Sequence, residues 1–163
     1  AFEKPIVLCD LGCGDFNIGK KLVEYTKEYI AVDIVSALIA HNSVVFKADN
    51  LAFHCLDIVV DDLPSGDCAV LRQVLQHLSN VEIQCVISKL SQFKHVILTE
   101  HIPNGYFIPN KDIISGQGIR LKKQSGLNLL DPPFSFSVKE EELLSVDLGE
   151  QKGTVVTTLY TTH

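Results

Sequence analysis

A glycine-containing turn near the start of the chain is the segment whose residues point most clearly to chemistry. It consists of Cys9-Asp10-Leu11-Gly12-Cys13-Gly14-Asp15-Phe16-Asn17 and follows an apolar run. Glycines at such a turn let the backbone approach a ligand closely, and N–H groups at a helix start attract electronegative atoms, so a nucleotide-like ligand is predicted. A dinucleotide fingerprint needs a third glycine where Asn17 stands, and it does not need the acid of Asp10. A nicotinamide cofactor is therefore the weaker alternative.

Two further acids follow apolar runs at positions that suit the same ligand. Asp33 ends one run roughly 20 residues past Gly14, where a carboxylate can accept hydrogen bonds from ribose hydroxyls. Asp57 ends the next run and precedes Ile58, which together offer an acceptor for an exocyclic amine and an aliphatic face for an adenine ring. Arg72 ends a fourth run. Strands that end in polar groups predict a ligand crevice at one edge of an open α/β sheet.

The elements that must position these residues alternate along the chain. Strands are predicted over residues 6–9, 29–33, 52–56, 68–72 and 94–100, and helices over 17–27, 36–42 and 79–92. The last helix has the clearest pattern, because Ser79 and Glu82 form a capping box. Two strands at 145–149 and 154–161, joined by a turn at 150–153, must be antiparallel. The expected fold is α/β with a mostly parallel sheet.

Three stretches depart from this regular alternation. Between residues 102 and 134 Gly, Pro and Asn are dense without periodicity, which is typical of a lid or a binding segment. Too few residues separate Asp57 from Asp67 for a crossover helix, so we expect at most a turn there. A second capping box at 137–140 predicts a short helix that ends at Leu144.

Length and composition narrow the functional class. The 163 residues suit one domain, and 46% hydrophobic with 21% charged residues is typical of globular chains. No membrane span or secretory signal is visible, so a cytoplasmic protein is expected. A net charge of −6 with scattered lysines argues against a nucleic-acid partner. The five cysteines form no C-x-x-C pair, so we expect reduced thiols and no metal site.

Four of these motifs together resemble those of a known enzyme family. Asp10-Leu11-Gly12-Cys13-Gly14, Val32-Asp33, Leu56-Asp57 and the run 71–78 are similar to successive motifs of the class I S-adenosylmethionine-dependent methyltransferases, over residues 6–101. The resemblance is to small bacterial members whose acceptors are undefined. It implies a Rossmann-like, doubly wound, mostly parallel seven-stranded sheet that ends in an antiparallel strand pair. It also implies S-adenosylmethionine as the cofactor.

The resemblance assigns roles on the cofactor side. It places the methionine moiety on the first turn, the ribose after the second strand, the adenine after the third strand, and the sulfonium beside the segment that follows the fourth. The cofactor-binding residues implied are, in chain order, Asp10, Gly12, Cys13, Gly14, Asp33, Ile34, Asp57, Ile58 and Arg72.

The acceptor side is less well defined. His77 and His101 follow the fourth and fifth strands and are the candidate general bases, although a packed or capping histidine is the commoner role at such positions. Two further candidates, Lys111 and Arg120, lie in a lid segment that is similar to a substrate-side loop of those bacterial enzymes. They could contact an anionic or sugar-like group, or they could be surface charges. The candidate substrate contacts are Gln73, Gln76, Lys111 and Arg120.

One motif points to a different acceptor class. Asp131-Pro132-Pro133-Phe134 matches the loop with which amino-methylating enzymes grip a planar nitrogen, but those enzymes carry it after the fourth strand and here it follows the fifth. We interpret it as a segment that stiffens the loop. The sequence therefore predicts methyl transfer to a small-molecule acceptor, with oxygen favoured over nitrogen. The alternative is a module that keeps the cofactor pocket, or only the fold, without turnover.

The chain begins almost directly on its first predicted strand. Only residues 1–5 precede it, whereas enzymes of this family usually carry helices there that close over the cofactor. We expect a single methyltransferase-like domain over residues 1–163, in which either the lid 102–134 supplies the closure or the chain is a trimmed form. The sequence predicts neither the acceptor nor the oligomeric state.

Overall fold

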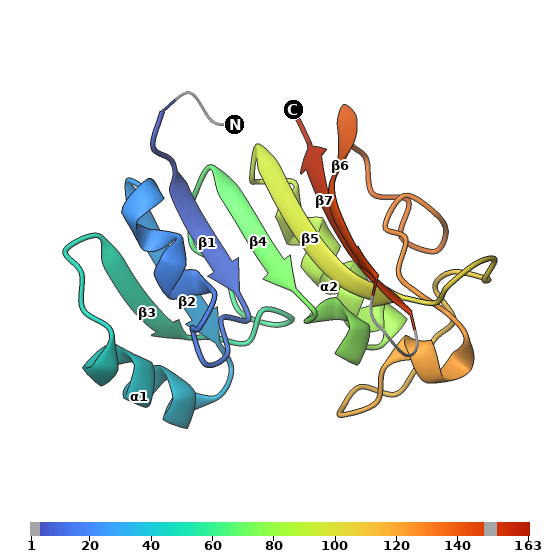
Figure 1. The fold of residues 1–163 in the computed structure, drawn as a ribbon, viewed down its shortest axis with the longest axis horizontal. Coiled ribbons are helices and arrows are strands. Elements are labelled where there is room, and N and C mark those ends of the chain that lie inside the picture. Colours follow the sequence, from blue (N-terminus) through green and yellow to red (C-terminus); the bar gives the residue numbers. More distant parts are fainter. Residues whose placement is uncertain (1–3, 149–152) are drawn as a thin grey trace.

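Apolar runs along the chain form seven strands that lie side by side in one twisted sheet (Figure 1). The computed structural model describes residues 4–148 and 153–163. In chain order the elements are β1 Val7–Leu11, the 3-10 turns η1 Gly19–Lys21 and η2 Val23–Tyr25, β2 Glu28–Asp33, α1 Ser36–Val45, β3 Leu51–Cys55, β4 Cys68–Arg72, the 3-10 turn η3 Leu75–His77, α2 Asn80–Leu90, β5 His95–Ile102, the 3-10 turn η4 Arg120–Lys123, β6 Glu140–Leu148 and β7 Thr154–Thr161.

The strand order is β3-β2-β1-β4-β5-β7-β6, with β1 to β5 parallel and β7 antiparallel to both of its neighbours. This confirms the predicted mostly parallel seven-stranded sheet with an antiparallel C-terminal pair. The chain order reverses between β1 and β4, and the carboxyl ends of β1, β2 and β4 meet at one edge. Such a switch point is where open α/β sheets bind ligands.

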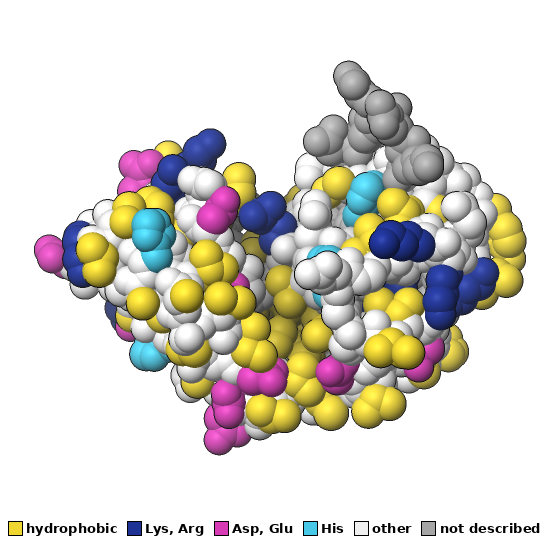
Figure 2. Space-filling model, turned by 90° about the horizontal axis from the view of Figure 1, so that it is seen from below, with side chains coloured by type: hydrophobic (Ala, Val, Ile, Leu, Met, Phe, Trp, Pro, Cys, Tyr) yellow, Lys and Arg dark blue, Asp and Glu magenta, His cyan; other side chains and the backbone are white. Residues whose placement is uncertain are grey.

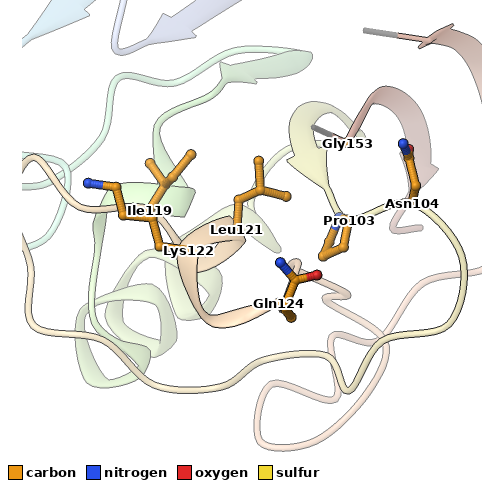
Figure 3. A pocket seen from close by; sticks show the side chains of 7 residues that line it. All are labelled: Pro103, Asn104, Ile119, Leu121, Lys122, Gln124 and Gly153. Carbon is orange, nitrogen blue, oxygen red and sulfur yellow. The ribbon is translucent and has the colours of Figure 1, made fainter. Parts of the chain in front are cut away.

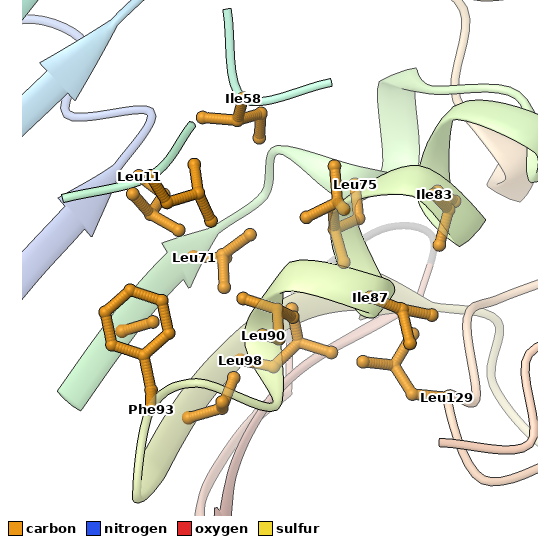
Figure 4. Close-up of a cluster of buried hydrophobic side chains, with 14 of the residues drawn as sticks. Leu11, Ile58, Leu71, Leu75, Ile83, Ile87, Leu90, Phe93, Leu98 and Leu129 are labelled. Atoms are coloured by element: carbon orange, nitrogen blue, oxygen red, sulfur yellow. The ribbon is translucent and has the colours of Figure 1, made fainter. Parts of the chain in front are cut away.

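Alternating side chains along the strands form two separate cores, one on each face of the sheet. On one face, Leu11 and Leu71 pack against Ile83 and Leu90 of α2 (Figure 4). On the other face, the ring of Phe16 packs edge-on against Tyr29, Phe46 and Phe53. The helix α2 has the predicted capping box, in which Ser79 and Glu82 each bond the other's backbone N–H.

The helix predicted over 17–27 is wrong, because this segment forms only η1 and η2. Its bonds run between residues three apart, such as Leu22 N to Gly19 O at 2.8 Å. Packing explains the difference: a Cβ at Gly19 would lie 2.4 Å from the Phe16 ring and 2.9 Å from the Tyr29 hydroxyl. Gly19 therefore packs directly on the aromatic cluster, and the segment lies against it as two 3-10 turns.

The short helix predicted from the capping box at 137–140 is also wrong. The segment is strand β6 from Glu140 onward, paired with β7 so that Glu140 lies opposite Thr161. The strand predicted over 145–149 therefore begins earlier, and most of the turn at 150–153 lies outside the described residues. Because backbone pairing with β7 satisfies every second N–H and C=O of the segment, it outweighs a local helix-start pattern.

Of the other two departures from regular alternation, the turn after β3 is as predicted. No helix connects β3 to β4; residues 56–67 make only a turn, in which the amides of Val60 and Asp61 bond the carbonyl of Asp57. The segment 102–134 contains only η4. Part of it belongs to the protein core, since Leu127, Leu129 and Phe134 are buried against the α2 side of the sheet.

Candidate functional site

A cavity of about 370 Å³ opens at the carboxyl ends of the parallel strands, within the size range of small-molecule sites. Figure 2 looks onto this edge and shows a hollow between two lobes with hydrophobic side chains in its floor. Of the residues expected to bind a cofactor, all but Asp10 line the cavity. The lining residues are Gly12, Cys13, Gly14, Asp33, Ile34, Leu56, Asp57, Ile58, Val59, Arg72, Gln73, Val74, His77 and Leu78.

The glycine turn forms one wall. The amides of Gly12 and Cys13 both donate to the carbonyl of Val32, at 2.8 and 2.9 Å, so the turn crosses over the end of β2. Gly12 has a φ of 97°, and a Cβ there would lie 2.3 Å from Val74 Cγ2. Gly14 also has positive φ, but a Cβ there would meet nothing within 4 Å. The turn therefore needs glycine to pack at Gly12 and leaves open space at Gly14.

Asp33 is held rigidly beside this turn. One carboxylate oxygen accepts a hydrogen bond from Gly14 N and the other from Val35 N, each at 2.9 Å. Each oxygen keeps a further lone pair, so the carboxylate can still accept bonds from two neighbouring hydroxyl groups. A buried amide missed by the sequence analysis supports the same turn: Asn42 of α1 donates to the Gly14 carbonyl at 2.8 Å.

Asp57 and Ile58 form the opposite wall. The Asp57 carboxylate accepts from Val59 N at 2.8 Å, and its own backbone N–H donates to Asp61 Oδ2 at 2.8 Å. Asp57 thus fixes its own turn with one oxygen and has the other available. Ile58 is largely buried and joins the sheet core while lining the cavity, whereas Ile34 is exposed. The arrangement offers an acceptor next to aliphatic surface.

Asp10 lies behind the wall that the glycine turn forms and does not line the large cavity. Its side chain is 6% exposed and accepts a hydrogen bond from the Tyr29 hydroxyl at 2.8 Å. Burial raises the pKa of Asp10 to about 6, although the Tyr29 bond and the charge of Arg72 act in the other direction. Asp10, Tyr29 and Arg72 share a smaller cavity of about 20 Å³, enough for roughly one water molecule. Arg72 lines both cavities and so links Asp10 to the larger one.

His77 lies at the rim of the larger cavity, at the end of η3. Its Nδ1 is 3.1 Å from the Gly116 carbonyl oxygen, and Gly116 N donates to the His77 carbonyl at 3.0 Å. Because a carbonyl oxygen can only accept, Nδ1 carries the hydrogen in this bond, and Nε2 of the neutral ring has the free lone pair. His77 can therefore accept a proton or a hydrogen bond through Nε2.

Of the other acceptor-side candidates, Gln73 lines the cavity and the rest do not. Gln73, a positive-φ residue, lines it, but Gln76 is buried and donates to the Gln73 carbonyl at 3.4 Å. Lys111 is exposed and bonds the Lys123 carbonyl. His101 lies next to Gly153, where a Cβ would come 2.8 Å from its Nε2.

Arg120 occupies a different place from the one expected of a substrate contact. It is 1% exposed and donates to the backbone carbonyls of Leu75 and Gln76 and to the side chain of Asn80. It is thus a buried residue that joins the lid segment to η3 and α2.

A second, open cavity of about 570 Å³ lies between the loop after β5, η4 and the start of β7 (Figure 3). None of the predicted site residues is among those that line it, which are Pro103, Asn104, Ile119, Leu121, Lys122, Gln124 and Gly153.

The Asp131-Pro132-Pro133-Phe134 motif lines neither cavity. Phe134 is buried in the core, and Asp131 accepts a hydrogen bond from the Asn128 side chain at 2.9 Å. Within the described part of the chain, no three His, Cys, Asp or Glu side chains gather as metal ligands would. No helix found in those same residues is long and apolar enough to cross a membrane.

Comparison with known proteins gives structural neighbours only. No family model and no curated protein matches the sequence. Among solved structures, the N-methyltransferase NodS of Bradyrhizobium japonicum, in complex with S-adenosylhomocysteine, aligns with a TM-score of 0.71 at 10% identity, over 98% of this chain and 80% of that one. Human N-acetylserotonin methyltransferase with bound S-adenosylmethionine aligns with a TM-score of 0.66 at 14% identity, over 96% of this chain and 47% of that one.

A third neighbour is the magnesium protoporphyrin IX methyltransferase of Synechocystis, also with bound S-adenosylmethionine. Its TM-score is 0.59 at 16% identity, over 97% of this chain and 71% of that one. At sequence identities this low, the structural alignments establish the fold alone, and the activity has to be argued from the site. The chain has the fold of the S-adenosylmethionine-dependent methyltransferases.

Proposed function

We propose that this protein binds S-adenosylmethionine in the cavity at the carboxyl ends of β1, β2 and β4 and transfers its methyl group to a small-molecule acceptor. The observation that carries the proposal is the fixed Asp33 carboxylate, bonded to Gly14 N across the glycine turn at 2.9 Å. It presents acceptors for vicinal hydroxyls beside a stretch of backbone that a ligand can approach closely.

The remaining lining residues fit the same cofactor. Asp57 and Ile58 offer an acceptor and an aliphatic face for an adenine ring. Arg72 is a cation suited to the carboxylate of the methionine moiety, and Asp10 supports it from behind through their shared small cavity. Asp10 thus acts on the methionine end through Arg72. The open space at Gly14 leaves room for direct contact with the backbone.

The bound cofactor would supply a methyl group already activated by a sulfonium, so the protein has to position the acceptor and exclude water. His77 lies at the cavity rim with the Nε2 lone pair free. For a hydroxyl acceptor, Nε2 takes the proton that leaves the oxygen as the new carbon–oxygen bond forms. Gln73 also lines the cavity and is a hydrogen-bonding contact for the acceptor.

The preference for oxygen over nitrogen rests on the Asp131-Pro132-Pro133-Phe134 motif. Some amino-methylating enzymes grip a planar nitrogen with that loop, whereas here Phe134 is buried in the core and Asp131 is bonded to Asn128, away from the cavity. With that loop away from the cavity, a hydroxyl group that passes its proton to His77, or a carboxylate that is already ionised and needs no base, is the better supported acceptor.

A cofactor-binding module without turnover is the second candidate. The burial of Gln76 and Arg120 favours this second candidate, because it removes two predicted acceptor contacts from the cavity. Of the predicted acceptor-side residues, Gln73 and His77 line the cavity. Label transfer separates the two functions. Incubation of the protein and methyl-labelled S-adenosylmethionine with a fractionated small-molecule extract should yield a labelled product, and more slowly with His77→Gln. Binding of the cofactor without label transfer to any fraction would support the module instead.

A further inference from the structure

A buried polar cluster surrounds the turn η3 that carries His77. Arg120 donates to the carbonyls of Leu75 and Gln76 at 3.2 and 3.5 Å, and to Asn80 Oδ1 at 2.6 Å. These three acceptors run from the start of η3 to the first residue of α2. A guanidinium can bridge them because its N–H groups form a rigid planar fork. One side chain therefore fixes the path of the chain on both sides of His77.

Glu100, at 3% exposed, faces the same turn from β5. Burial raises the pKa of Glu100 to about 8, although the amides of Gln76 and Leu75 and the charge of Arg120 act in the other direction. Neither of its carboxyl oxygens accepts a regular hydrogen bond from a described residue, and neither does Gln76 Oε1. Arg120 Nε likewise donates no regular hydrogen bond to a described residue. A buried cluster with such unpaired atoms costs free energy, so its presence calls for a role other than stability.

The loop that carries Arg120 also makes the contact that sets the His77 ring. Gly116, four residues earlier, accepts from His77 Nδ1 and donates to the His77 carbonyl. Its neighbour Ser115 accepts a bond from Ser79 N at 2.7 Å. Arg120 and Gly116 thus tie the same loop to η3, one through the main chain before His77 and the other through the ring itself.

We propose that Arg120 is a positioning residue, which holds η3 and the 115–120 loop together so that the His77 ring keeps its hydrogen on Nδ1 and turns Nε2 to the cavity. This rests on the proposed function in one respect, since the orientation matters for catalysis only if the cavity holds cofactor and acceptor. The placement of the ring itself can be measured in the ligand-free protein.

The test is the state of the His77 ring in protein labelled with ¹⁵N-histidine, from long-range ¹H–¹⁵N correlation spectra at alkaline pH, with His77→Gln to assign the signals. The wild type should show a protonated Nδ1 and a bare Nε2. In Arg120→Met the two nitrogen signals should move toward each other, as in a freely exchanging ring. Arg120→Lys reaches fewer acceptors at once and should lie between.

The matched control is Lys122→Met, which removes a cation from the exposed side of the same turn η4 and should leave the His77 signals as in the wild type. If Arg120→Met does not fold, Arg120→Lys decides alone. Wild-type ring signals in a folded Arg120 variant would overturn the proposal.

Calorimetry with S-adenosylhomocysteine tests the proposed function separately. Arg120 does not line the cavity, so the affinity of the Arg120 variants should differ from that of the wild type by less than about threefold. A wild type that does not bind S-adenosylhomocysteine would refute the cofactor assignment and not the positioning role of Arg120.

Discussion

Replacing Glu100 by glutamine should change how the stability of the protein depends on pH. Burial of this 3% exposed side chain raises its pKa from 4.5 to about 8, despite the Gln76 and Leu75 amides and Arg120. The folded protein therefore holds the proton more tightly than the unfolded chain. The stabilising contribution is complete below pH 4.5 and is lost as the pH rises to about 8. The difference between the two pKa values corresponds to about 5 kcal/mol.

The assay is urea unfolding of both proteins at several pH values across that range. Glutamine stays neutral, so the free energy of unfolding of the wild type should fall relative to that of Glu100→Gln, by up to about 5 kcal/mol at the alkaline end. Glu24→Gln, an exposed site, is the matched control and should follow the wild type. A constant difference between wild type and Glu100→Gln at every pH would show that the pKa of Glu100 is not raised in the folded protein.

Three further substitutions test individual contacts. Gly12→Ala places a Cβ 2.3 Å from Val74 Cγ2, so calorimetry should show S-adenosylhomocysteine binding at least tenfold weaker, about 1.4 kcal/mol; unchanged affinity would contradict the packing of the turn. Ser79→Ala removes the helix cap and should lower the free energy of unfolding in urea by about 1–2 kcal/mol, whereas no loss would speak against the capping box. Tyr29→Phe removes the bond that lowers the pKa of Asp10, so carbon NMR should find this carboxyl titrating above about 6, and a lower midpoint would refute the contact.

The gathering of Asp33, Asp57 and Arg72 at one cavity could be predicted from the sequence because they stand directly after short apolar strands. Parallel strands bring their carboxyl ends together, so Asp33, Asp57 and Arg72 meet without any knowledge of packing. Asp10 shows the limit of this argument. It lies inside β1, where side chains alternate between faces, and its place between Cys9 and Leu11 turns it to the other core beside Tyr29. The first strand predicted from the sequence ends at residue 9, and the structure extends it to Leu11, which places Asp10 inside the strand and behind the cavity wall.

Long-range packing explains what could not be predicted. Arg120 can be buried because it bonds acceptors at Leu75 and Asn80. These acceptors lie about 40 residues earlier in the chain, so no local sequence pattern around Arg120 predicts its burial. The two predicted helices that are absent failed for related reasons. The η1 turn packs through Gly19 directly against Phe16 and Tyr29, and the segment from Glu140 pairs with β7.

Calorimetric titration with S-adenosylhomocysteine tests the central claim most directly. The wild type should bind one molecule per chain, and Asp33→Asn should bind at least tenfold more weakly, because the amide replaces one acceptor oxygen with a donor that faces a backbone N–H. Asp15→Asn, at an exposed carboxylate of the same turn outside the cavity, is the matched control and should bind like the wild type. Absence of binding to the folded wild type, or equal affinity in folded Asp33→Asn, would contradict the assignment of this cavity to the cofactor.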